Sequence, residues 1–302
     1  MEQDVRLETR QSGVFTDYRA VLSSVVRSPA AWLFLGLSLV ATLYIALTGH
    51  AVDLLVCLEP LFFLLLTFLV IVPLTAGAPF AAPWEEFRSS SRSQLWWQVI
   101  IVVVFVLLLV FAVPLADLVH FSPLVSILNL LKLVVPLAGA LLLGARWREL
   151  GFGRGYRSWW SALVLSAPLI VALIILLAIR MITPRTVLLA FLNSFVLAGL
   201  GEEFTFRGVL MTRLARLFQR DWGLGVSSLF FGTAHTLANI GYFNHASLLP
   251  AFALSIPFQA LYGLVLAIVL QRTRNLVAGI ALHTWTDTLN FALLPLIIHF
   301  LR

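Results

Sequence analysis

The chain alternates between long apolar runs and short polar segments. The runs are continuous and lack the apolar and polar alternation of a transmembrane β-strand. Several exceed the roughly 20 residues with which an α-helix crosses a hydrocarbon layer of about 30 Å. We therefore expect an all-α, multi-pass transmembrane bundle of about eight to nine helices, with apolar runs over 30–48, 54–78, 97–116, 123–145, 161–179, 186–200, 224–240, 246–270 and 276–301.

Composition supports a membrane protein. Apolar residues make up 61% of the chain and charged residues 11%, whereas soluble domains contain about 25% charged residues. Residues 1–29 hold charges of both signs and no apolar block, so we expect a cytoplasmic segment and no cleavable signal peptide. Cys57 is the single cysteine, which excludes an internal disulfide and a thiolate-rich metal site.

The arginines predict the orientation in the membrane. With the N-terminus in the cytoplasm, the inner segments hold fifteen arginines, and the outer segments hold only Arg180, Arg185 and Arg302. This bias places the N-terminus inside and the C-terminus outside. The net charge of +6 comes from short clusters between apolar runs, so we expect a lipid bilayer and no nucleic acid as the partner of these charges.

The sequence suggests two parts after the N-terminal segment. Residues 30–145 would form about four N-terminal transmembrane helices, and 146–302 would form a C-terminal helical core. The Gly- and Arg-rich segment 144–158 is the best boundary between them. There is no internal repeat that would indicate further division.

Ionisable residues interrupt three of the C-terminal apolar runs. A charged side chain at mid-bilayer costs about 2.5 to 3.5 kcal/mol on insertion scales, so these residues require compensation inside the bundle. They are Glu202, Glu203 and Arg207 in the continuation of the sixth run to residue 211, His235 in the seventh, and His283 and Asp287 in the ninth.

Helical spacing predicts how these side chains are arranged. Glu203 and Arg207 are four residues apart and can pair, whereas Glu202 points about 100° away. His283, Asp287 and Asn290 follow an i, i+4, i+7 pattern and form one polar stripe. At about 1.5 Å per residue from the nearest cytoplasmic arginines, the cluster lies roughly 14 to 22 Å deep. We expect access from the cytoplasmic half.

Each of these residues also has a purely structural interpretation. Glu203 with Arg207 would be an ion pair between helical turns, and His235 a hydrogen-bonded buried histidine. His283 with Asp287 would join two helices. Their occurrence at matching depth favours a functional site, because buried ionisable clusters in membranes mark reaction or transport sites. Lys132 is interpreted as structural or snorkelling, and Glu59 as interfacial.

Three motifs resemble the CAAX-protease and bacteriocin-processing family, which includes the Rce1-type endoproteases of prenylated proteins. The first reads Glu202-Glu203-Phe204-Thr205-Phe206-Arg207, the second Phe231-Gly232-Thr233-Ala234-His235, and the third His283-Thr284-Trp285-Thr286-Asp287. Their order and spacing within 188–290 carry the resemblance. Position 287 is aspartate where the eukaryotic enzymes have asparagine.

The resemblance implies an intramembrane endopeptidase of the glutamate type, acting on a membrane-associated or lipidated protein or peptide in a bacterial plasma membrane. Glu202 with His235 would activate a water molecule, and His283 with Asp287 would stabilise or orient the tetrahedral intermediate. Glu203, Arg207 and Phe231 would support the site. We expect no cofactor.

Three alternatives remain at this point. Glutamate, aspartate and two histidines could bind zinc, although the HExxH spacing is missing. The protein could also be a non-catalytic bacteriocin-immunity or scaffold protein. A proton-coupled transporter would predict two similar halves, which the sequence lacks. The oligomeric state is open.

Overall fold

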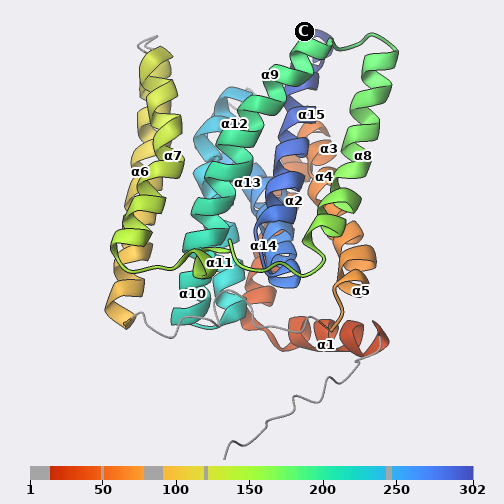
Figure 1. Cartoon of the computed structure of the whole chain (residues 1–302). Helices are drawn as coiled ribbons and strands as arrows, with labels where there is room; N and C mark the ends of the chain where they lie inside the picture. The colour runs from red at the N-terminus through yellow and green to blue at the C-terminus, as the bar shows by residue number, and fades with distance from the viewer. Residues whose placement is uncertain (1–13, 49–50, 78–90, 119–121, 243–246, 302) are drawn as a thin grey trace, which may run out of the picture.

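A computed structural model describes residues 14–48, 51–77, 91–118, 122–242 and 247–301. Across these ranges the chain forms helices and no strands, which confirms the all-α prediction. Each of the nine apolar runs lies in one helix or in a series of consecutive helices. The protein is a multi-pass helical membrane bundle (Figure 1).

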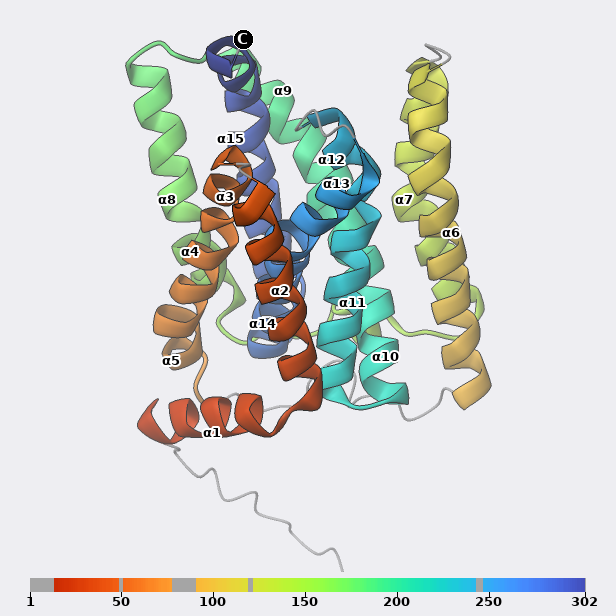
Figure 2. The same cartoon turned by 180° about the vertical axis from the view of Figure 1, so that it is seen from behind.

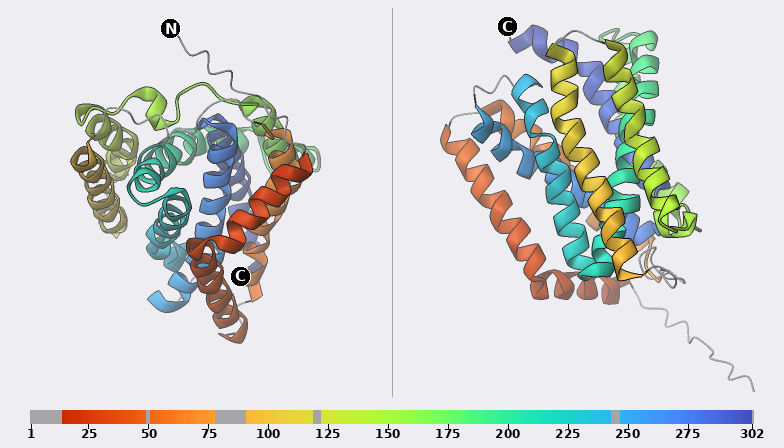
Figure 3. Two further views of the ribbon diagram at one scale, coloured as in Figure 1. Left: turned by 90° about the horizontal axis from the view of Figure 1, so that it is seen from below. Right: turned by 90° about the vertical axis from the view of Figure 1, so that its left-hand side faces the viewer.

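Within the described ranges, six segments are long and apolar enough to cross a membrane, namely Pro29–Thr48, Asp53–Leu74, Arg92–Ala112, Ser158–Ala178, Pro184–Leu217 and Leu248–Thr273. The last of these is mostly buried by its neighbours, whereas the others expose most of their surface, as lipid-facing helices do. It therefore forms the centre of the bundle, as the view from below shows (Figure 3, left).

The N-terminal part begins with a helix that the sequence interpretation did not predict. Helix α1 (Val14–Arg27) lies across one end of the bundle (Figures 1 and 2). Its apolar residues recur every three or four positions instead of forming a block, so a search for continuous runs misses it. Leu22 and Val26 are 54% and 64% exposed, and the Tyr18 hydroxyl donates to Leu69 O (3.2 Å).

The N-terminal transmembrane helices contain one interruption that matters for the site. Pro60 has no N–H to donate to Val56 O, so α3 ends at Val56 and α4 begins at Leu58. The elements are α2 (Pro29–Thr48), α3 (Ala51–Val56), α4 (Leu58–Leu66), the π-helix η1 (Thr67–Ile71), α5 (Val72–Leu74), α6 (Arg92–Leu118) and α7 (Ser122–Leu142). Lys132 lies in α7, and its side chain is outside the described residues.

The C-terminal part contains two long helices that each include a π-helical segment, over 184–217 and 248–273, and a third helix that breaks at His235. Its elements are the 3-10 turn η3 (Trp147–Leu150), α8 (Ser158–Ala178), α9 (Pro184–Ser194), the π-helix η4 (Phe195–Met211), α10 (Thr212–Leu217), α11 (Arg220–Ala234), α12 (Thr236–Tyr242), α13 (Leu248–Ser255), the π-helix η5 (Ile256–Ala260), α14 (Leu261–Thr273) and α15 (Val277–Leu301). Pro257 explains the widened turn η5, because it cannot donate to Ala253 O.

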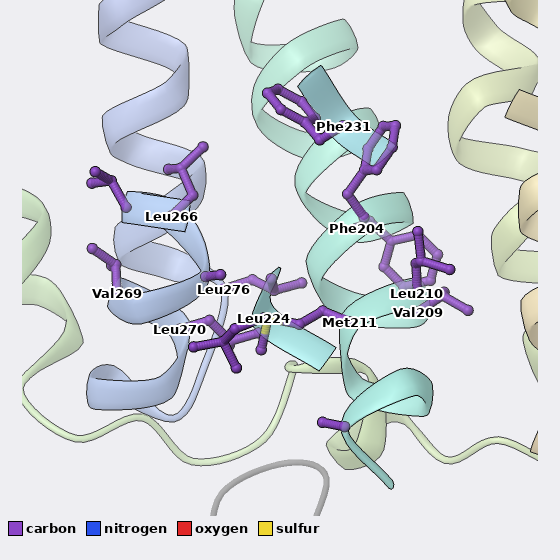
Figure 4. Packing of buried hydrophobic residues seen from close by; sticks show 14 of the residues in the cluster. Phe204, Val209, Leu210, Met211, Leu224, Phe231, Leu266, Val269, Leu270 and Leu276 are labelled. Carbon is purple, nitrogen blue, oxygen red and sulfur yellow. The ribbon is translucent and has the colours of Figure 1, made fainter. Parts of the chain in front are cut away.

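One large cluster of buried hydrophobic residues joins the two parts. It contains Phe63, Val99 and Val102 from the N-terminal helices together with residues of η4, α11, α14 and α15. Figure 4 shows Met211 of η4 close to Leu224 and Leu276 on the side of α14, with Val209 and Leu210 on the other side of η4. This cluster therefore contains residues from both sides of the predicted boundary near residue 146.

Arg213 corrects one detail of the charge analysis. Arg213 is one of the fifteen arginines that the charge analysis assigned to the inner segments between apolar runs. The helix instead continues through α10, and Arg213 is completely buried. Its Nε donates to Gln98 Oε1 (2.6 Å), and its Nη1 donates to the carbonyl oxygens of Glu149 (3.1 Å) and Gly208 (3.0 Å). Arg213 thus links α10 to α6 and η3 by hydrogen bonds of a charged donor.

Candidate active site

The three motifs converge on one polar cluster at the centre of the bundle. Glu202, Glu203 and Arg207 lie on η4, where i→i+5 hydrogen bonding widens the helix. His235 lies between α11 and α12, and His283 is on α15. The predicted site residues therefore meet in space from three separate helices.

Glu203 holds two other members of the cluster. Its Oε1 is 3.0 Å from Arg207 Nη1 and 2.9 Å from His283 Nδ1. The side chains of Glu203 and Arg207 are each 1% exposed, so the two charges compensate one another inside the apolar bundle. Since a carboxylate only accepts, His283 Nδ1 carries a proton and donates it to Glu203.

The Phe231 ring packs against Arg207 of this ion pair and against the rings of both histidines. The Arg207 guanidinium lies 4.2 Å from the centre of the Phe231 ring, a cation–π contact. The Phe231 ring also contacts His235 (centroids 4.7 Å apart) and His283 (5.8 Å). Phe231 therefore supports both histidines and the arginine at once.

Two glycines allow α14 and α15 to approach the ion pair. A Cβ at Gly279 would lie 2.9 Å from Glu203 Oε2, and a Cβ at Gly263 would lie 3.1 Å from Arg207 Nη2. Small residues at such positions let membrane helices pack closely. The close approach of α14 and α15 is what seals Glu203 and Arg207 from their surroundings.

His235 forms the break in the seventh predicted run. Its backbone N–H donates to Gly232 O instead of Phe231 O, and its Nδ1 lies 2.7 Å from Phe231 O. A carbonyl oxygen only accepts, so Nδ1 carries the proton and replaces the backbone bond that the break removes. The Nε2 atom is then directed away from its own helix.

Glu202 faces the Nε2 atoms of both histidines. Its Oε2 is 3.7 Å from His235 Nε2 and 3.9 Å from His283 Nε2. In neutral histidines with protonated Nδ1, both Nε2 atoms are acceptors. Three acceptors therefore converge at distances that suit a bridging water molecule or a shared proton.

Asp287 lies at the edge of this cluster. Its Oδ2 is 4.0 Å from His283 Nε2, beyond hydrogen-bonding distance. The pairing of His283 with Asp287 that we expected is thus weaker than the bond between His283 and Glu203. The sequence interpretation gave Glu203 only to Arg207, because spacing along one helix cannot reveal a partner on another.

The members of the cluster differ in exposure. Glu202, His235 and Asp287 have side chains 15%, 28% and 28% exposed. Ala278 of α15 and Leu266 of α14 are completely buried. His235 directly precedes α12, and Asp287 lies one turn after His283 in α15.

Sequence reasoning assigned Glu59 to the membrane interface, but it contacts the polar stripe of α15. Asn290 Nδ2 lies 3.5 Å and 3.4 Å from the two oxygens of Glu59. Sequence reasoning also missed Tyr262. The centre of its ring lies 5.5 Å from that of His283, and its hydroxyl donates to Thr286 Oγ1 (2.9 Å). The place of Glu59 as an acidic residue within an apolar run was the sequence signal that could have identified it as part of the site.

No three His, Cys, Asp or Glu side chains in the described ranges form a group that could hold a metal ion.

Comparison with known families identifies the motif-bearing region. Residues 184–289 match the family of type II CAAX prenyl endopeptidase Rce1-like proteins. These residues form an Rce1-like domain. No curated protein and no solved structure matches the chain. The Rce1-like domain extends from the start of α9 into α15 and contains all the residues of the three motifs. The match supports a membrane endopeptidase of this family.

Replacing Glu203 with glutamine tests its supporting role in the Rce1-like domain. A neutral amide would leave Arg207 buried without its counter-charge, which costs several kcal/mol for buried pairs. We expect Glu203→Gln to lower the yield of monodisperse protein in detergent and the midpoint of thermal unfolding. The control Asp221→Asn, at a partly exposed residue in the first turn of α11, should leave both close to wild type. A fully stable but inactive Glu203→Gln protein would show that Glu203 acts in the reaction itself.

Proposed function

We propose that the protein is an intramembrane endopeptidase of the glutamate type that hydrolyses a peptide bond in a membrane-associated or lipidated protein or peptide. The observation that carries the proposal is the convergence of Glu202 Oε2 with the Nε2 atoms of His235 and His283. The Rce1-like domain supports the reaction class.

In the proposed reaction, a water molecule donates one proton to Glu202 and its oxygen attacks the peptide carbonyl carbon. A tetrahedral oxyanion forms. The proton that the three converging acceptors can share lies on His283 Nε2 in this step, so that Nε2 donates a hydrogen bond to the oxyanion while Glu203 fixes Nδ1. The carbon–nitrogen bond then breaks, and the proton held by Glu202 passes to the leaving amine. His235 orients Glu202 and the water.

The same geometry supports a glutamate mechanism better than a zinc mechanism. His283 Nδ1 is engaged by Glu203, and Glu202 lies close to both Nε2 atoms in the position of a base. The chelator experiment below tests the metalloprotease alternative.

A non-catalytic immunity or scaffold protein would not need Glu202 beside the Nε2 atoms of two histidines. Absence of cleavage would favour this non-catalytic alternative.

We further propose a bacterial plasma membrane location with a cytoplasmic N-terminus. The arginine bias supports this orientation. With this orientation, the site would be reached from the cytoplasmic half, as the depth of the motif residues along their helices predicts.

Glu202→Gln tests the proposed base. An amide cannot take a proton from water, so proteolysis should fall by a factor of at least about 100 while the unfolding midpoint stays close to wild type. Cleavage of a peptide library by purified protein in detergent provides the measurement, with Asp221→Asn as control. Normal turnover by folded Glu202→Gln protein would refute the mechanism.

Asp287→Asn separates the glutamate and zinc mechanisms. An amide keeps a hydrogen-bond donor beside His283 but binds zinc poorly. We expect substantial cleavage by Asp287→Asn, inactive Asp287→Ala, and no effect of chelators on the wild type. Loss of activity in Asp287→Asn, together with activity that follows zinc removal and restoration, would establish a metalloprotease.

Fusions at the two ends test the orientation. Alkaline phosphatase fused after Arg302 should be active in intact bacteria, whereas green fluorescent protein there should stay dark. A fusion within the loop at Arg154 should give the opposite pattern. Active phosphatase at Arg154 and fluorescence at Arg302 would reverse the proposed orientation.

A further inference from the structure

The N-terminal helices, which lie outside the Rce1-like match, reach the candidate active site at two points. Glu59 and Phe63 are four residues apart on α4 and share one face. Phe63 is 1% exposed, and its ring lies 6.2 Å from that of Tyr262, which in turn packs against His283. Glu59 contacts Asn290 on α15.

The contact between Glu59 and Asn290 joins α4 to the polar stripe of α15. The amide of Asn290 donates towards both carboxylate oxygens at 3.4 and 3.5 Å. Asn290 is three residues after Asp287 and seven after His283, so all three lie on one side of α15.

Local sequence explains how Glu59 reaches this position. The interruption caused by Pro60 separates α3 from α4 immediately before Glu59. The backbone is therefore redirected at the depth of the site, and α4 packs along α14. Residue 59 is far from residues 184–289 and residue 290 follows them directly, so both partners lie outside the matched domain.

We propose that Glu59 is a positioning residue for the reaction, and that it acts through Asn290 to fix the α15 stripe carrying His283 and Asp287 relative to Glu202. The inference rests on the proposed function. It assigns to the N-terminal helices a direct part in the active site. Misalignment of a catalytic group lowers the rate more than it weakens substrate binding.

A charge clash followed by its removal tests this pairing. Asn290→Asp places two carboxylates opposite one another, which should displace the stripe and lower kcat at least about 10-fold per folded protein, with KM within about 2-fold. Glu59→Gln in the same protein restores an amide facing a carboxylate, with donor and acceptor exchanged. The double variant should recover kcat to within about 3-fold of wild type.

The control is Asp221→Asn combined with Asn290→Asp, which removes a distant negative charge and should rescue nothing. All rates are normalised to monodisperse protein, and unfolding midpoints are measured in parallel. Wild-type kcat in Asn290→Asp, or a double variant no better than Asn290→Asp alone, would overturn the inference and leave the proposed function standing. A wild-type protein that cleaves no peptide would instead refute the proposed function.

Discussion

The buried carboxylate of Glu203 is the interaction on which the rest of the site depends. Inside an apolar bundle a guanidinium is costly unless an opposite charge lies beside it. Glu203 supplies that charge to Arg207 at 3.0 Å and uses the same oxygen to accept from His283 at 2.9 Å. One carboxylate thereby connects η4 to α15 and sets the tautomer of a candidate catalytic histidine. Because His283 Nδ1 is engaged in this way, its Nε2 is directed towards Glu202.

The adjacent glutamates differ because their surroundings differ. Glu203 is sealed by the close approach of α14 and α15 at Gly263 and Gly279, so it serves as a fixed counter-charge. Glu202 is 15% exposed and faces the Nε2 atoms of both histidines. Two identical side chains next to one another in sequence thus have different burial and partners, which suit the supporting and the chemical role that we propose for them.

The helices before the Rce1-like domain do more than anchor the protein in lipid. Phe63 extends the aromatic packing behind His283 through Tyr262, and Glu59 meets Asn290 at the far end of the α15 stripe. The hydrophobic core also runs without interruption from these helices into η4 and α14. A family match over 184–289 therefore covers the motif residues but leaves out part of their immediate environment.

The sequence by itself determined the helical class, the positions of the apolar runs and the identity of the residues that meet at the centre, because hydrophobicity and i, i+4 spacing are properties of single helices. It also paired Glu203 with Arg207. Only the tertiary structure decided which neighbours the helices present to one another: His283 to Glu203, Glu59 to Asn290, and Arg213 to Gln98. The different exposures of Glu202 and Glu203 belong to the same group, since position along one helix does not show what covers a side chain. These features depend on the packing of several helices, and no pattern along one segment encodes them.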